Sequence, residues 1–130
     1  MARGRYEITK DRDGVYSFRL VTVFGKPVAV GGTYKSLALC KKGIASLRVN
    51  SDAPAEDLTV MSEISEGGEQ IKCPKIVISR DEGMNGYNFV VKAKNGGVIA
   101  RGEGYGTRIK CLEAVENLRY TAFLADTTEI

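Results

Sequence analysis

Residues 16–48 read YSFRLVTVFGKPVAVGGTYKSLALCKKGIASLR, and residues 87–119 read YNFVVKAKNGGVIARGEGYGTRIKCLEAVENLR. Aligned without a gap, the two segments share nine identical residues in 33 pairs. Self-similarity at a fixed separation is the mark of a repeated structural unit. The sequence therefore predicts a tandem duplication in which each residue of the first unit corresponds to the residue 71 positions later. Upstream, Tyr6–Ile8 aligns with Ile76–Ile78 at a separation of 70.

Each unit begins with a pattern typical of antiparallel strands. In Tyr16–Leu20 the large apolar residues fall at every second position, which is the period of a strand with one buried face. Asp13-Gly14 precedes this strand and Asn95-Gly96-Gly97 follows its second copy, as expected of hairpin turns. Pro27 has no N–H group, so we expect it at the start or the edge of the third strand.

A helix follows the three strands in each unit. Ser36 and Thr107 occupy equivalent positions and suit the N-cap, where a hydroxyl accepts a hydrogen bond from a free amide. The predicted core repeats in both units, with helical i, i+4, i+7 spacing in its second part. It consists of Tyr16, Phe18, Cys40, Ile44 and Leu47 in the first unit and Tyr87, Phe89, Cys111, Val115 and Leu118 in the second.

The predicted fold is α+β, with two tandem β-β-β-α(-β) repeats packed as one compact pseudo-twofold domain. Each repeat is expected to hold an antiparallel meander sheet and one helix, with short fourth strands at Glu56–Val60 and Thr127–Ile130. The expected units are residues 1–61 and 75–130, joined by an acidic, glycine-containing connector over 62–74. A unit of about 55 residues is close to the limit for independent folding, which favours a shared core.

The amino-acid composition argues against several classes of function. There is no His, the commonest general base and zinc ligand, and no C-x-x-C pair, so we expect neither a catalytic site nor a metal or other cofactor. Three cysteines and no apolar run of bilayer length predict a cytoplasmic protein without membrane contact. Cys40 and Cys111 are expected in the core, and Cys73 is expected to be more exposed, as an unreactive thiol or, alternatively, a reactive one.

Several segments together resemble the YegP-like tandem-repeat family, small bacterial and archaeal domains of unknown function. They are Tyr6–Asp11, Tyr16–Leu20, Tyr34–Ile44, Asn50–Pro54, Glu56–Thr59, Gly86–Phe89 and Gly104–Cys111. The second unit departs from the pattern, because Val90 stands where the first has Arg19 and Ala114 stands where it has Gly43. The resemblance implies a β-β-β-α unit paired within or between chains, and it implies no known activity.

The distribution of charge suggests one candidate surface. Residues 1–48 hold ten Lys/Arg and three Asp/Glu, whereas residues 49–74 hold one Lys and six acids. A basic first unit could contact an anion or a nucleic acid, although solvated faces explain the same charges. The candidate contacts are Arg19, Lys35, Lys41, Lys42, Lys92, Lys94, Arg101, Arg108 and Lys110. Tyr34 and Tyr105 are expected to pack at the helix entry, with base stacking as the alternative.

Two further motifs could be functional, but each also has a structural explanation. Asp11 and Asp81 could pair for acid–base chemistry, but a strand-end Asp more often starts a turn. The run Gly102–Gly106, expected to open a helix, is at most a weak phosphate cradle. The sequence therefore predicts a non-enzymatic module that binds an unidentified partner or associates with itself as a homodimer. A nucleic-acid-binding accessory protein is the alternative.

Overall fold

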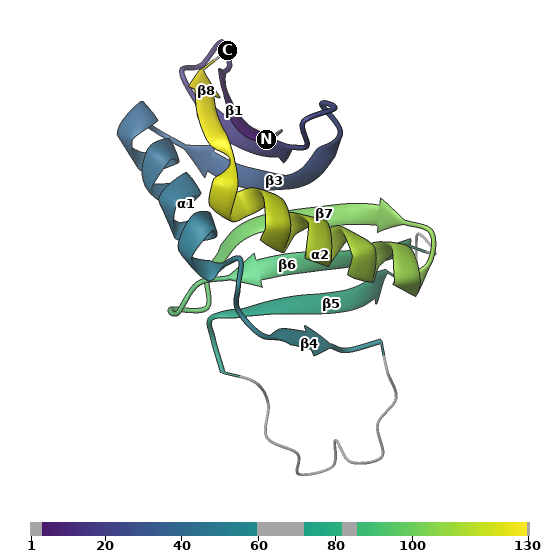
Figure 1. Ribbon diagram of the computed structural model, residues 1–130. Coiled ribbons are helices and arrows are strands. Elements are labelled where there is room, and N and C mark those ends of the chain that lie inside the picture. Colours follow the sequence, from purple (N-terminus) through teal and green to yellow (C-terminus); the bar gives the residue numbers. More distant parts are fainter. Residues whose placement is uncertain (1–3, 60–71, 82–85, 130) are drawn as a thin grey trace.

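The computed structural model describes residues 4–59, 72–81 and 86–129. The connector predicted at 62–74 therefore lies largely outside the described residues. The elements in chain order are β1 (Arg5–Lys10), β2 (Tyr16–Val21), β3 (Pro27–Tyr34), α1 (Leu37–Asn50), β4 (Ala55–Asp57), β5 (Lys75–Asp81), β6 (Gly86–Lys92), β7 (Val98–Tyr105), α2 (Arg108–Leu124) and β8 (Asp126–Glu129). The α+β class is confirmed, with two helices on one sheet (Figure 1).

The strands form a single mixed sheet in the order β4-β5-β6-β7-β3-β2-β1-β8. The hairpins are antiparallel, and β3 meets β7 at the centre through the pairs Val30–Arg101 and Gly31–Ala100. The outermost pairs, β4 with β5 and β1 with β8, are parallel. The predicted antiparallel meanders are present as β1-β2-β3 and β5-β6-β7. The expectation of two separate sheets was wrong, because β3 and β7 join the meanders into one sheet, and the short fourth strands add parallel pairs at its edges.

These fourth strands cross from one half of the chain to the other. β4 follows α1 but pairs with β5, and β8 follows α2 but pairs with β1. The strands predicted at Glu56–Val60 and Thr127–Ile130 are present in shifted form, with Val60 and Ile130 outside the described residues. Each half of the chain thus supplies an edge strand of the sheet that pairs with the first strand of the other half.

Local sequence accounts for the turns and the helix starts. Asp11 Oδ1 accepts hydrogen bonds from the amides of Asp13 and Val15, each at 2.9 Å, as predicted for a turn residue. Gly14 follows with φ at 78°, a conformation that favours glycine. Ser36 and Thr107 cap α1 and α2 by accepting from the amides three residues later.

Both helices pack on the same face of the sheet over one apolar core (Figure 1). Every predicted core residue is buried except Tyr16 and Tyr87, which lie partly buried against the cluster. The Phe18 and Phe89 rings lie so close to Gly31 and Gly102 that a Cβ at either glycine would overlap the ring. These glycines therefore let each ring lie flat across the neighbouring strand.

Candidate functional site

The predicted cationic contacts do not converge on one surface. Lys35, Lys41 and Lys42 lie around the start of α1, whereas Arg108 and Lys110 lie at the start of α2. The two helix N-termini are at opposite ends of the helix layer (Figure 1). Lys92 ends β6, Lys94 lies in the turn after it, and Arg19 and Arg101 lie on the face of the sheet away from the helices.

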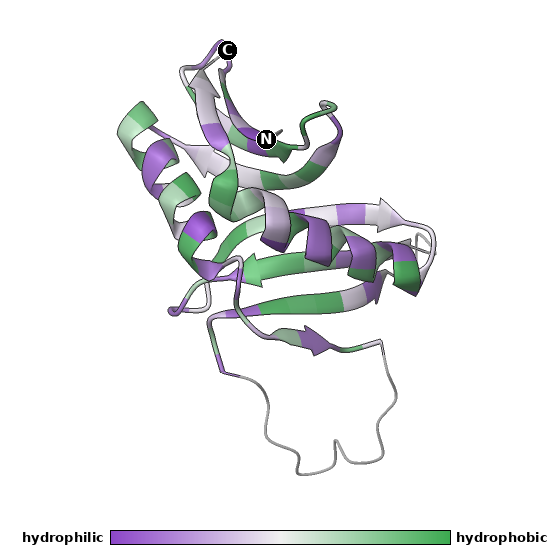
Figure 2. Cartoon of the chain, viewed as in Figure 1, coloured by the Kyte–Doolittle hydropathy of each residue, from purple (hydrophilic) through white to green (hydrophobic). Residues whose placement is uncertain are grey.

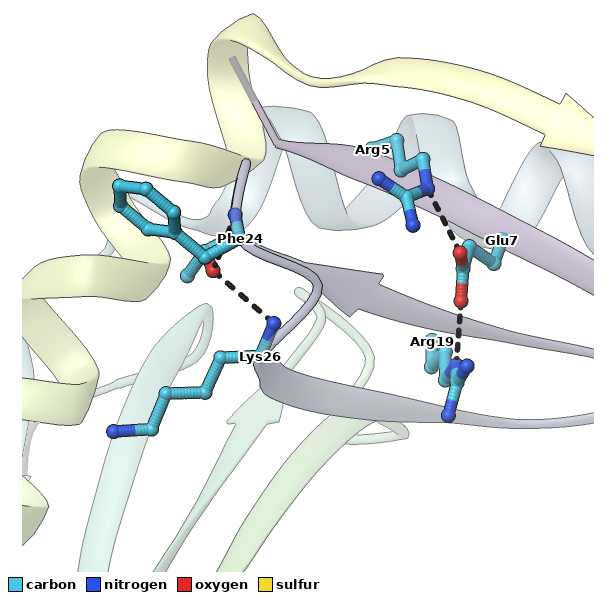
Figure 3. A network of polar contacts seen from close by, with 6 residues as sticks. Arg5, Glu7, Arg19, Phe24 and Lys26 are labelled. Carbon is cyan, nitrogen blue, oxygen red and sulfur yellow. Dashed lines mark hydrogen bonds and ion pairs between the residues drawn. The ribbon is translucent and has the colours of Figure 1, made fainter. Parts of the chain in front are cut away.

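Two of these cations already have carboxylate partners. Arg19 Nε lies 2.7 Å from Glu7 Oε1, and Arg5 Nε lies 2.8 Å from Glu7 Oε2 (Figure 3). Hydrogen bonds from Arg19 and then Arg5 hold the pKa of Glu7 below its ordinary value of 4.5. Glu7 is almost completely buried, so the two guanidinium groups compensate a charge that water barely reaches.

Arg108 is the second paired cation. Its Nη2 contacts Asp57 Oδ2 at 2.6 Å, and its Nε donates to Thr59 Oγ1 at 3.2 Å. Burial acts to raise the pKa of Asp57, but hydrogen bonds from Thr59 and Arg108 more than offset it, and the pKa is lowered. This contact ties the start of α2 to β4, so Arg108 has a structural role in the fold.

The other sequence motifs also have structural roles. Tyr34 stacks on Phe18 with ring centroids 6.0 Å apart, and Tyr105 stacks on Phe89 at 6.1 Å. Gly102, Gly104 and Tyr105 lie in β7, so the expectation that this run opens a helix was wrong. The side chain of Asp81 lies outside the described part of the structure, so its pairing with Asp11 stays untested.

The two core cysteines lack the environment of reactive thiols. Cys40 and Cys111 are completely buried in the core, as predicted. Burial raises the pKa of Cys40, and it raises the pKa of Cys111 to about 11, with a smaller contribution from Asp57. Cys73 is partly exposed. Within residues 4–59, 72–81 and 86–129, no group of three or more acidic or thiol side chains is arranged to hold a metal ion.

An exposed apolar surface on α2 was missed by the sequence interpretation. We call it the α2 surface and define it by its exposed apolar side chains, Phe24, Ile109, Tyr120, Phe123 and Leu124. Phe24 is 93% exposed at the tip of the β2–β3 turn, which lies beside α2 (Figure 3). A hollow of about 330 Å³ between this turn and α2 is lined by Phe24, Tyr120 and Leu124, among others.

The α2 surface differs from the corresponding surface of the other half of the chain. The residues aligned with Phe24, Ile109, Tyr120 and Phe123 are Asn95, Ala38, Val49 and Asp52. Three of these four aligned residues are small or polar, so most of the α2 surface has no large apolar counterpart in the other half of the chain. The alignment of the two halves holds part of this signal, because Ile109 and Phe123 stand where the first half has Ala38 and Asp52.

Neither helix of the described chain is long and apolar enough to cross a membrane.

Known proteins resemble both the sequence and the fold. A family model described as "Domain of unknown function (DUF1508)" matches residues 11–57 and 84–129. A UPF0339 protein of Acinetobacter baylyi is 30% identical over 128 residues, covering 96% of this chain and 97% of that protein. A UPF0339 protein of Treponema denticola is 44% identical over 48 residues, which are 37% of this chain and 83% of that protein.

The solution structure of the yegP protein of unknown function from E. coli shares this fold. It aligns with a TM-score of 0.74 and 19% identity, covering 99% of this chain and 94% of that one. At this identity the match establishes the fold alone. The resemblance inferred from the sequence motifs is therefore confirmed at the level of family and fold.

Proposed function

Because the chain belongs to the DUF1508 family, whose description assigns no function, we propose a function from its geometry: a non-enzymatic binding module that engages a protein through the α2 surface. The single observation that carries this proposal is the exposure of Phe24, Tyr120 and Phe123 on one side of the molecule. Phe24, Tyr120 and Leu124 line one hollow, and exposed apolar side chains gathered in this way mark interaction sites on folded proteins.

The proposed module is a tandem duplication. Its units are residues 1–61 and 75–130, joined by 62–74, and together they form one pseudo-twofold domain. The same order of elements in each half and the crossing of β4 and β8 support this proposal. The Treponema denticola relative supports it too, because its matched 48 residues make up most of that protein. In this proposal the two units differ at the α2 surface, to which the first unit contributes Phe24 and the second unit the helix α2.

The chemistry of the acids and thiols favours binding over catalysis. The pKa values of two described carboxylates, Glu7 and Asp57, are lowered by contacts with arginines, whereas a general acid needs a raised pKa. Three free cysteines support a reducing, cytoplasmic location.

A site-specific photo-cross-linker tests the proposed function. Tyr120→p-benzoylphenylalanine replaces one exposed aromatic residue by another, and we expect it to form a protein adduct on irradiation in the native host. The matched control places the same residue at Val30, which is exposed on the opposite face of the sheet. Mass spectrometry of the adduct identifies the partner. An absence of adducts at position 120, or equal adducts at both positions, contradicts the proposal.

Nucleic-acid binding is the alternative function. It is supported by the exposed lysines around the start of α1, Lys35, Lys41 and Lys42. The pairing of Arg19 and Arg108 with carboxylates weakens it. Titration of random duplex RNA and DNA at about 50 mM salt tests it, because counterion release makes phosphate contacts strongest at low salt. Absence of binding there excludes this alternative.

A further inference from the structure

We propose that the protein bound at the α2 surface is a second copy of this chain, packed helix layer against helix layer. In this dimer α2 of each copy lies on α1 of the other copy. The inference rests on the proposed function and adds the identity of the partner. It is argued from the complementary side chains that the two helices present outward.

The outward side of α2 is apolar at its ends and acidic in its middle. Ile109 lies near the start, Tyr120 and Phe123 lie near the end, and Glu113 and Glu116 lie between them. These residues are exposed and share one helical face, opposite the buried Cys111, Val115 and Leu118. Figure 2 shows this pattern as green at both ends of α2 and purple in its middle.

The outward side of α1 has the opposite character. Its exposed residues at the equivalent positions are Ala38, Lys42, Ala45 and Val49, so this face carries small side chains and one positive charge. Lys42 aligns with Glu113, and Ala45 aligns with Glu116. Small alanines leave room for the large side chains of α2, and Lys42 offers a positive charge to Glu113. Glu116 already lies 3.8 Å from Arg119 Nη1 in its own helix. The two faces are therefore complementary in both size and charge.

This complementarity favours a dimer in which α1 packs on α2 over one in which α2 packs on α2. If α2 packed on α2, Glu113 and Glu116 would lie opposite the same acids of the other copy, and like charges repel. Since both helices lie on one face of the sheet, a twofold axis between facing helix layers places α1 over α2 twice. Every favourable contact is then made in duplicate.

The apolar area of the interface is adequate for a dimer. An aromatic side chain buries roughly 150–250 Å², and Tyr120 and Phe123 are 69% and 70% exposed. Together with Ile109, Leu112 and Val49 they supply on the order of 500 Å² of apolar surface per copy. A standard interface buries about 800 Å² per partner. The side-chain stems of the lysines and glutamates can cover the remainder.

Reversal of one charge on each helix tests the arrangement by sedimentation of the full chain. We expect the native chain to be a dimer, and K42E and E113K each to raise the dimer dissociation constant at least about tenfold, because each reversal acts at two contacts. An equimolar mixture of the two variants is expected to dimerise again, since α1 of each variant then meets a complementary α2. The controls R101E and E103K make the same charge changes at exposed positions of β7, outside both helices, and should leave the native constant unchanged.

Two results would overturn this inference. One is a native chain that remains monomeric up to about 1 mM; the other is a dimer that K42E and E113K leave intact. Circular dichroism of each variant separates loss of folding from loss of association. If the chain is monomeric but the cross-linker at position 120 captures a different protein, the proposed function stands and only the second copy is excluded as the partner.

Discussion

Arg48 and Arg119 occupy equivalent positions in the two helices, and each donates to a carbonyl beyond its own half. Arg48 Nη1 lies 3.4 Å from the Phe123 carbonyl oxygen near the end of α2, and Arg119 Nη2 lies 2.9 Å from the Ala53 carbonyl oxygen after α1. Carbonyl groups at a helix C-terminus lack intrahelical donors, and the helix dipole favours a cation there. The two arginines therefore join the helix ends where the halves meet.

The two arginines are expected to contribute unequally to stability. Arg48 also stacks 4.7 Å from the centre of the Tyr6 ring, and its Nη2 donates to Thr127 Oγ1. By contrast, the buried Nε of Arg119 lacks a hydrogen-bond partner within the described residues. We expect R48M to cost about 1–3 kcal/mol of unfolding free energy and R119M to cost less, as measured by urea denaturation. A larger loss in R119M would show that the Ala53 contact outweighs those of Arg48.

Tyr6 is expected to make stability fall at alkaline pH. Its hydroxyl donates to the Ala122 carbonyl oxygen at 2.6 Å, and burial raises its pKa far above the ordinary value of 10.0. The folded state therefore keeps this proton when the unfolded state loses it. The contribution is complete below pH 10.0 and declines as pH rises toward the folded pKa.

The variant Y6F isolates this effect. It should cost about 1–2 kcal/mol at neutral pH because it leaves the Ala122 carbonyl without its donor. The difference from the native chain should shrink above pH 10.0 in urea titrations. A constant difference across this range would contradict the assignment of the raised pKa to Tyr6.

The Glu7–Arg19 pair can be tested against its own counterpart. Glu7 and Arg19 lie opposite each other on β1 and β2, and the equivalent residues Val77 and Val90 lie opposite each other on β5 and β6. Glu7 is nearly buried and Arg19 is half exposed, and in R19V the carboxylate keeps only its contact with Arg5. Replacing both members of a pair by apolar residues is often neutral, because no desolvated charge is left behind. We expect R19V to lower the urea midpoint more than E7V/R19V does.

Lowering the pH should reveal how much the same pair contributes to stability. Since the folded pKa of Glu7 is lowered from 4.5, its contribution is present above that pH and is lost as pH falls through the folded value. The double variant E7V/R19V should therefore lose less stability than the native chain between pH 4.5 and lower pH. Parallel curves for the two proteins would contradict this assignment.

The thiols should differ sharply in reactivity. In the folded protein at pH 8 we expect Ellman's reagent to modify Cys73 alone, because burial and raised pKa values keep Cys40 and Cys111 protonated and inaccessible. In urea all three thiols should react. The variant C73S is the control, and rapid labelling of folded C73S would show that the core opens readily.

Local patterns in the sequence were sufficient for the turns, the caps and the helix cores. Asp11, Ser36 and Thr107 act on amides within four residues of themselves, so their roles follow from short-range geometry. The exchange of fourth strands could not be predicted in this way. β4 and β8 are short and polar, and their partners β5 and β1 lie in the other half of the chain.

The candidate site was predicted less well than the fold. The charges near the helix starts were visible in the sequence, but the pairing of Arg19 with Glu7 depends on strand register. The α2 surface was overlooked because an apolar residue such as Tyr120 could equally belong to the core. Only the orientation of α2 on the sheet decides which of its apolar residues face outward.

The parallel pairing of β1 with β8 has a mechanical consequence. Arg5 lies beside Asp126, and Ile8 lies beside Glu129, so both strands run the same way along the sheet edge. Tension applied between the beginning of β1 and the end of β8 would slide one strand along the other and load all their hydrogen bonds together. The β1–β8 pair is therefore loaded in shear. It resists stretching far better than a hairpin, whose hydrogen bonds break one at a time.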